Sequence, residues 1–303
     1  MHPDWINSLK NLQLAATLKQ DHPLFAPLTH LSILTVSGTD AAVFLQGQST
    51  CDIKALVDNQ PSLGAFCNAK GRTLSTFIII KQAEQFLLIL TKDLLATVQK
   101  KLQMYILRAD VQLSDASDHL CLIGLHHYQL ETPTQVYAYP QLANSHLWIG
   151  TPEEAIQLCH NLVQQGISGV DRNTWLALDI QAGIPWLFKA TSEEFVPQMI
   201  NLDKLNAISF EKGCYTGQEI VARTHYLGKN KRALYQASCV TDTDIILGCS
   251  ISEAGEESKL LGTVVLTSKQ ETGSQLLVVL KDQAHEVKNL QLNNSNHDKI
   301  SLN

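Results

Sequence analysis

The segment KGCYTGQE, from Lys212 to Glu219, contains the residue whose chemistry stands out in this chain. Its cysteine, Cys214, lies between Gly213 and Gly217, and glycines permit the backbone conformations of a tight loop at the start of a helix. A thiol near a helix N-terminus and beside Lys212 ionises more readily than a free thiol. The spacing therefore predicts a reactive thiolate, an anion site or a close ligand contact. An inert buried cysteine is the alternative, of equal weight from the residues alone.

A mixture of strands and helices precedes this segment and must position it. Asp4 is a suitable N-cap for an N-terminal helix, which is predicted to end near Gln20. Asp40 and Asp93 are predicted to cap two further helices. Apolar, β-rich runs predict strands at 31–36, 65–68, 73–80 and 86–90, and the second and third of these flank a turn. These elements predict an N-terminal α+β unit over residues 1–116.

A second α+β unit is predicted over residues 117–227. Its strands are expected at 121–125 and 145–150, and its helices begin at Pro152 and after Asp171. His126 and His127 follow the first of these strands, but adjacent strand residues point to opposite faces, so we do not expect them to share a metal. The chain contains no Gly-x-Gly-x-x-Gly, P-loop or Gly-x-Ser-x-Gly motif.

The composition changes after Gly228, and residues 228–303 are predicted to form a small, all-β barrel. Strands are expected at 232–240, 260–268 and 276–280, separated by Asp, Gly, Glu and Ser. The polar end of the chain, NNSNHDKISLN, is expected to be frayed. The predicted fold class is therefore α+β, with two mixed α+β units and a C-terminal β-barrel.

Composition and charge narrow the class of protein. The chain has 303 residues and a net charge of −6, which argues against a generally basic nucleic-acid binder. No apolar run is long enough to span a membrane and no signal peptide is evident, so a cytoplasmic location is expected. The seven cysteines show no C-x-x-C spacing, which argues against a disulfide framework and a local zinc site. We therefore expect no bound metal and, apart from Cys214, buried thiols.

KGCYTGQE followed by VAR resembles the signature of the YgfZ family of folate-binding proteins, which is related to the aminomethyltransferase (T-protein) of the glycine cleavage system. The likeness extends over most of the chain. The other segments with the order and spacing of that family are FLQGQSTCDI, CNAKGR, WLALDIQAGIP, FVPQMINLDKL and GKNKRAL. The resemblance implies two α+β units and a β-barrel round a central opening that binds a reduced folate, such as tetrahydrofolate.

The resemblance also implies roles for particular residues. Cys214 matches the family's functional cysteine, a thiol for redox chemistry or for handling sulfur or metal. Trp175 matches a tryptophan implicated in folate binding, and an indole face can stack on a flat pterin. The residues that match the motif around Cys214 are Lys212, Gly213, Tyr215, Gly217, Gln218, Glu219 and Arg223. Without the resemblance, Trp175 would be interpreted as a helix residue of the core.

Two positions depart from the pattern. Gln181 stands where related proteins often carry a glutamate, and an amide offers one acceptor and one donor where a carboxylate accepts two hydrogen bonds from a pterin. Ser32 stands where some relatives have a second tryptophan. Both changes bear on folate affinity, so Gln181 is a candidate folate contact of altered chemistry.

Three functions follow as hypotheses. The favoured one is a folate-binding accessory protein, not a classical enzyme. It would support the assembly or repair of iron–sulfur clusters and, through iron–sulfur enzymes, tRNA modification. Its partners would be iron–sulfur enzymes or assembly factors, held transiently because one thiolate cannot hold a cluster alone. The second is a folate-dependent aminomethyl or one-carbon transferase, for which Asp52 and Asp179 are candidate acids or bases, although each is more simply a helix-cap or surface acid.

The third hypothesis is an interaction module without folate binding. Lys229, Lys231 and Arg232 form a local basic run that could contact an acidic partner or RNA, although a solvated turn explains three charges equally well. Because the chain as a whole is acidic, direct binding of nucleic acid is not expected.

Overall fold

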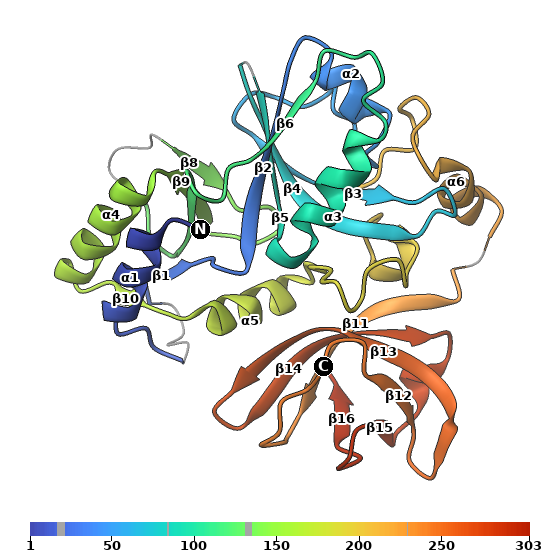
Figure 1. Cartoon of the computed structure of the whole chain (residues 1–303). Helices are drawn as coiled ribbons and strands as arrows, with labels where there is room; N and C mark the ends of the chain where they lie inside the picture. Colours follow the sequence, from blue (N-terminus) through green and yellow to red (C-terminus); the bar gives the residue numbers. More distant parts are fainter. Residues whose placement is uncertain (17–21, 84, 131–134, 229) are drawn as a thin grey trace. The chain divides into compact units, whose positions relative to one another are not determined.

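The computed structural model describes residues 1–16, 22–83, 85–130, 135–228 and 230–303 (Figure 1). The chain forms two compact units. One unit comprises residues 1–46, 52–63 and 77–175, and the other comprises residues 47–51, 64–76 and 176–303. The three-part division at residues 116 and 227 stays a prediction.

The first unit contains a five-stranded sheet with the strand order β10-β1-β7-β9-β8. Its strands are β1 (Leu24–Pro27), β7 (Cys121–His126), β8 (Val136–Ala138), β9 (Ser145–Gly150) and β10 (Ser168–Gly169). Helices α1 (Pro3–Asn11) and α4 (Pro152–Gln164) lie together beside this sheet (Figure 1). Trp5, Phe25 and Leu162 contribute to the apolar core between helices and sheet. Residues near the N-terminus therefore belong to the same sheet as β7 and β9.

The ends of the two helices show how local sequence sets them. α1 ends at Asn11, and Ala15 already forms a β-bridge, so the predicted helix does not continue beyond Asn11. Its predicted end, Gln20, lies outside the described residues. The His2 side chain, not that of Asp4, accepts the capping hydrogen bond. α4 begins as predicted, with Thr151 as its N-cap.

A second sheet has the order β3-β4-β5-β2-β6. Its strands are β2 (Leu31–Ser37), β3 (Pro61–Cys67), β4 (Thr73–Gln82), β5 (Gln85–Thr91) and β6 (Gln112–Asp115). α2 (Ala41–Gln46) follows β2, and α3 (Lys92–Gln103) packs on β2, β5 and β6. The N-cap of α3 is Thr91 in place of the expected Asp93. The four strands predicted here are present, and β6 was missed because its residues are mostly exposed.

Three further helical elements follow. α5 (Arg172–Ala182) begins where predicted, because the Asp171 carboxylate accepts a hydrogen bond from the Thr174 N–H at 2.7 Å. A 3₁₀ helix, η1, spans Pro197–Ile200, and α6 spans Gln218–Tyr226. Within the described ranges, no helix is long and apolar enough to cross a membrane.

The C-terminal strands close into a barrel in the order β11-β14-β13-β12-β15-β16, within the second unit (Figure 1). Their bounds are β11 (Arg232–Cys239), β12 (Ser250–Glu253), β13 (Glu256–Gln270), β14 (Gly273–Lys281), β15 (Leu290–Leu292) and β16 (Lys299–Leu302), with a short 3₁₀ turn, η2 (Ala284–Glu286), after β14. Alternate apolar residues such as Val264, Val278 and Ile251 fill the interior. The predicted α+β fold with a small C-terminal barrel is confirmed.

The expectation of a frayed C-terminus is wrong. β16 pairs with both β11 and β15, so it completes the closure of the barrel. Ile300 is buried in the barrel core, and the Asn303 N–H donates to the Gln236 carbonyl at 3.0 Å. The polar residues around it are typical of a frayed end, but Ile300 and the partly buried Leu302 both pack against the barrel core.

Ile300→Ala tests this pairing, and Lys299→Ala on the same strand is its matched control. Because Ile300 is buried and Lys299 is exposed, we expect the first change to lower the free energy of unfolding by about 2–4 kcal/mol and the second by less than about 0.5 kcal/mol. Urea unfolding measures both. Equal, negligible effects would mean that this segment does not close the barrel.

Candidate functional site

Cys214 lies in an irregular loop just before α6, and its side chain is exposed. Gly217 is the N-cap of α6, with φ 85°, a left-handed conformation that disfavours residues with a Cβ. The predicted tight loop at a helix N-terminus is therefore present. Gly213, by contrast, does not adopt a left-handed conformation, and an added Cβ would meet no atom within 4 Å.

Lys212 anchors the loop. Its side chain is only 7% exposed, and its ammonium donates to the backbone carbonyls of Ser49 at 2.7 Å and Cys51 at 2.8 Å. The same ammonium lies 5.0 Å from the centre of the Tyr215 ring, which is within cation–π range. The sequence suggested that this cation would favour a thiolate, whereas the structure shows it binding two carbonyls.

The residues after Cys214 are also anchored. Tyr215 is buried, and burial together with the nearby Cys67 raises the pKa of its hydroxyl. The Thr216 N–H donates to the Gly47 carbonyl at 3.1 Å, and its hydroxyl donates to the Gln48 side chain at 3.2 Å. Cys214 thus stands exposed between Lys212 and Tyr215, which are both buried, on a loop attached to residues 47–51.

The second contact surface of the loop is the hairpin between β3 and β4. The backbone of Gly217 approaches it so closely that an added Cβ would lie 2.5 Å from the Asn68 carbonyl oxygen and 3.0 Å from the Gly71 Cα. A Cβ on Gly71, whose φ is 68°, would lie 2.6 Å from the Ile220 Cβ. Two glycines are therefore required where α6 meets this hairpin.

α6 is held from the other side by η1. The Gln198 amide donates to the Val221 carbonyl at 2.7 Å, and its own backbone carbonyl accepts from the Asn230 side chain at 2.8 Å. Val221 is the buried residue of the helix, while Glu219 and Arg223 are exposed. Glu219 lies in the first turn and Arg223 in the last, the placements that the helix dipole favours.

The structure therefore unites four segments of the second unit: 47–51, the 68–71 hairpin, η1 and the Cys214 loop. Three of these supports, Asn68, Gly71 and Gln198, were not predicted from the sequence. A signal was available, because all three lie in CNAKGR and FVPQMINLDKL, which were noted only as parts of the resemblance.

Trp175 belongs to the first unit and is fully buried. Its indole lies edge-to-face with Tyr139, with ring centres 5.3 Å apart, and it packs so tightly on Gly124 that a Cβ there would lie 2.4 Å from the ring. Its Nε1–H is buried without a hydrogen-bond partner in the described residues. The residue serves as core packing, and it also has an unused donor.

Gln181 occupies the last turn of α5, six residues after Trp175, and its side chain is exposed. At 3.6 residues per turn the two side chains leave α5 from different faces. The backbone carbonyl of Gln181 accepts a hydrogen bond from the side-chain amide of Gln236 at 2.8 Å. α5 therefore gives Gln181 and Trp175 different surroundings.

The two candidate acids of the transferase hypothesis have structural roles. Asp179 is fully buried, contrary to the expectation of a cap or surface acid, and its Oδ2 accepts from the Trp186 Nε1–H at 3.0 Å. The Asp52 carboxylate accepts from the Gln46 side chain at 2.9 Å and from the Lys54 N–H at 3.1 Å. Each carboxylate therefore forms hydrogen bonds that hold neighbouring residues of its own segment in place.

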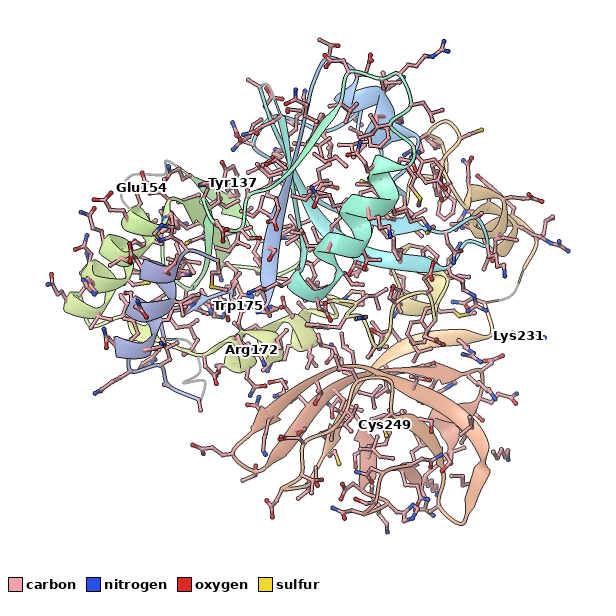
Figure 2. The ribbon with its side chains drawn as sticks, viewed as in Figure 1. Tyr137, Glu154, Arg172, Trp175, Lys231 and Cys249 are labelled. Atoms are coloured by element: carbon pink, nitrogen blue, oxygen red, sulfur yellow. The ribbon has the colours of Figure 1, made fainter. Side chains whose placement is uncertain are left out.

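The other cysteines behave as expected of structural thiols. Five of them are buried and Cys249, in the barrel (Figure 2), is half-buried. Burial raises the pKa of both Cys121 and Cys159 to about 12.

No group of three or more metal-ligating His, Cys, Asp or Glu side chains occurs in the described part of the chain. His126 instead pairs with the Ser145 hydroxyl at 2.6 Å. In the basic run, Lys231 is exposed and Lys229 lies outside the described residues.

Comparison with known proteins decides the family. No model of a known protein family matches the chain. The tRNA-modifying protein YgfZ of Yersinia pseudotuberculosis is 37% identical, over 69% of this chain and 70% of its own length. The protein of the same name from Pectobacterium carotovorum is 32% identical, over 88% of this chain and 83% of its own length. The chain belongs to the YgfZ family. The resemblance carried by KGCYTGQE is therefore confirmed.

Among solved structures, this YgfZ-family chain is similar to the glycine cleavage system aminomethyltransferase T of Bartonella henselae. The TM-score is 0.70 at 14% identity, and the match covers 93% of this chain and 85% of the other. At that identity the likeness shows a shared fold. The relation to the T-protein fold that the sequence implied is thus confirmed.

Gly217→Ala tests how the Cys214 loop is held. Left-handed strain and the clash with the Asn68 carbonyl should together lower the free energy of unfolding by about 2–4 kcal/mol. We also expect faster labelling of Cys214 by a thiol reagent, since the loop loses its support. The matched control is Gly213→Ala, which meets open space and should change neither urea unfolding nor labelling. Equal effects of the two changes would contradict this account.

Proposed function

We propose that this protein is a folate-binding accessory protein that supports tRNA modification by maintaining iron–sulfur enzymes, with Cys214 as its functional thiol. The observation that carries the proposal is an exposed cysteine on a loop fixed at Lys212, Thr216 and Gly217. Its relatives are named tRNA-modifying proteins, and a cytoplasmic location is part of the proposal.

The iron–sulfur role comes from the resemblance, and the loop suits it. An exposed thiol between buried neighbours can contact a macromolecular partner without rearrangement of the loop. One thiolate cannot hold a cluster, so any contact with a cluster would be shared with a partner and transient. The chemistry of Cys214 would be redox exchange or the handling of sulfur or metal.

The residues are compatible with a reduced folate. A bound folate would supply one-carbon or redox chemistry, while the protein's part is recognition. Among the described residues, the buried Nε1–H of Trp175 has no hydrogen-bond partner, and a pterin offers acceptors for it. Because the indole is fully buried, we propose that Trp175 contacts the pterin mainly through this hydrogen bond and less through stacking on its ring face. Gln181 stays a separate candidate contact, because its exposed side chain leaves α5 from a different face.

Binding of tetrahydrofolate under reducing conditions tests the ligand. We expect saturable binding in calorimetry that weakens about tenfold in Trp175→Phe, because a buried donor is lost while an aromatic ring remains. Trp5→Phe, a change of the same type in the core of the first unit, is the control and should retain affinity. Absence of binding by the wild type would refute the folate proposal.

The role of Cys214 is tested in a strain that lacks the gene. We expect Cys214→Ser to fail to restore modified tRNA nucleosides and iron–sulfur enzyme activity, since serine keeps the size but not the redox and sulfur chemistry. Cys249→Ser in the barrel should restore both. Mass spectrometry of digested tRNA and an enzyme assay provide the measurements. Full restoration by Cys214→Ser would remove the thiol from the mechanism.

A further inference from the structure

α6, the helix that follows the Cys214 loop, has an exposed apolar face. Val221 is the buried residue of this helix, whereas Tyr226 is 66% exposed and Leu227, the C-cap, is 84% exposed. Ile220 is exposed as well. At 3.6 residues per turn, the side chains of Ile220, Tyr226 and Leu227 all leave the helix on the side away from Val221. Large apolar side chains that gather on one exposed face are typical of a contact surface.

An aromatic cluster of Phe210, His225 and Tyr226 extends this face onto the loop before α6. The ring of Phe210 stacks on His225, with ring centres 3.7 Å apart, and meets Tyr226 edge-on at 6.2 Å. The His225 and Tyr226 rings are themselves 4.7 Å apart. These contacts restrain the Tyr226 ring although it is exposed. An aromatic side chain that is already ordered loses little entropy when a partner packs on it.

The loop brings this cluster and the thiol onto one surface. Residues 210–217 start at the C-terminal end of α6, where Phe210 packs on His225, and lead to the N-cap Gly217, so they run alongside the helix. Cys214 lies within this segment and is exposed. α6 has nine residues, and a helix of that length spans about 13 Å. A short segment of a partner can therefore contact the aromatic cluster and reach Cys214.

The chain around the aromatic cluster is basic. Residues 220–241 contain four Lys or Arg residues and no Asp or Glu, in a chain whose net charge is −6. Arg223 shares a face of α6 with Tyr226, and Lys231 lies just before β11 (Figure 2). Both cations are exposed, and neither forms an ion pair with another described residue. Unpaired cations beside exposed apolar side chains complement a partner that carries carboxylates beside an apolar residue.

We propose that the exposed face of α6 and its aromatic cluster bind an acidic segment of a client enzyme, the iron–sulfur enzyme that this protein serves, and so position it at Cys214. This rests on the client contact of the proposed function and adds a binding surface to it. Arg223 and Lys231 would meet the carboxylates of the segment, while an apolar side chain would pack on Tyr226 and Leu227. Tyr and Arg are among the residues that contribute most to protein–protein binding. The small area of one short helix suits a transient contact.

Two exposed carboxylates favour a protein over RNA as the occupant. Glu211 directly follows Phe210, and Glu219 lies in the first turn of α6. An RNA strand carries a charged phosphate at every nucleotide and would be repelled by these carboxylates, whereas a protein segment can place its acidic residues opposite Arg223 and Lys231 alone.

Leu227→Glu and Arg223→Glu test the surface. The probe is a purified iron–sulfur tRNA-modifying enzyme whose activity falls in the strain that lacks the gene. We expect its association with the full chain, measured by calorimetry at low salt, to weaken about tenfold in each variant, because a carboxylate then faces the acidic segment. Both side chains are exposed, so the melting temperature should change little. A wild type that does not associate with this enzyme overturns the proposal.

Ile246→Glu and Lys288→Glu are the matched controls, because they make the same changes of charge in the barrel. Ile246 is 76% exposed and Lys288 is exposed, and neither belongs to α6 or the aromatic cluster. Both variants should bind the enzyme as the wild type does, and an equal loss in these variants would contradict a defined surface. Added salt should weaken binding of the wild type more than that of Arg223→Ala, which has already lost one charge contact.

Complementation in the strain that lacks the gene separates this inference from the proposed function. Failure of Leu227→Glu to restore modified tRNA nucleosides, with folate affinity unchanged, supports the binding surface. Full restoration by Leu227→Glu, where Cys214→Ser fails, overturns the surface alone, whereas restoration by Cys214→Ser overturns the function on which it rests.

Two other occupants have their own signatures. A wild-type dimer that becomes monomeric in Leu227→Glu, measured by size-exclusion chromatography, would assign the surface to a second copy of the chain. Salt-sensitive binding of tRNA that is lost in Arg223→Glu, with enzyme association intact, would assign it to RNA. Either result overturns the proposal.

Discussion

The close approach of two glycine backbones fixes the position of the exposed thiol. At Gly217 and Gly71, α6 and the β3–β4 hairpin come together with no room for a Cβ on either side. Both residues also adopt left-handed φ values, so backbone conformation and close packing demand the same residue. Because Gly217 is also the N-cap of α6, this contact sets where the helix starts and where the preceding loop with Cys214 runs.

The buried ammonium of Lys212 completes that arrangement. Burying a charge is costly unless hydrogen bonds replace water, and the carbonyls of Ser49 and Cys51 provide this replacement. These partners lie more than 160 positions away in the chain, so the loop is held by segments that only the folded unit brings together. The Lys212 ammonium therefore stabilises the backbone of the loop through these hydrogen bonds. The thiol of Cys214 is available for reaction because it is exposed.

Many local features of this fold could be predicted from the sequence, although the predicted N-caps Asp4 and Asp93 each lie two residues after the observed ones, and features that depend on distant segments could not be predicted. The turn at Gly217, the cap at Asp171 and most strands follow from residues within one turn or one strand. The anchoring of Lys212 depends on residues 47–51, and the pairing of β16 depends on barrel closure. Asp179 was interpreted as a helix-cap or surface acid because its partner, the Trp186 indole, is not evident from sequence. Such errors concern tertiary contacts.

The two candidate residues of the proposed function, Trp175 and Cys214, differ in chemistry, and this difference supports separate tasks. Trp175 is buried, and its Nε1–H has no hydrogen-bond partner in the described residues, which suits the small heteroaromatic ligand proposed for it. Cys214 is exposed on a supported loop, which suits a partner too large to enter a pocket. The proposed accessory protein, which would bind a folate and contact a client enzyme, would use both residues.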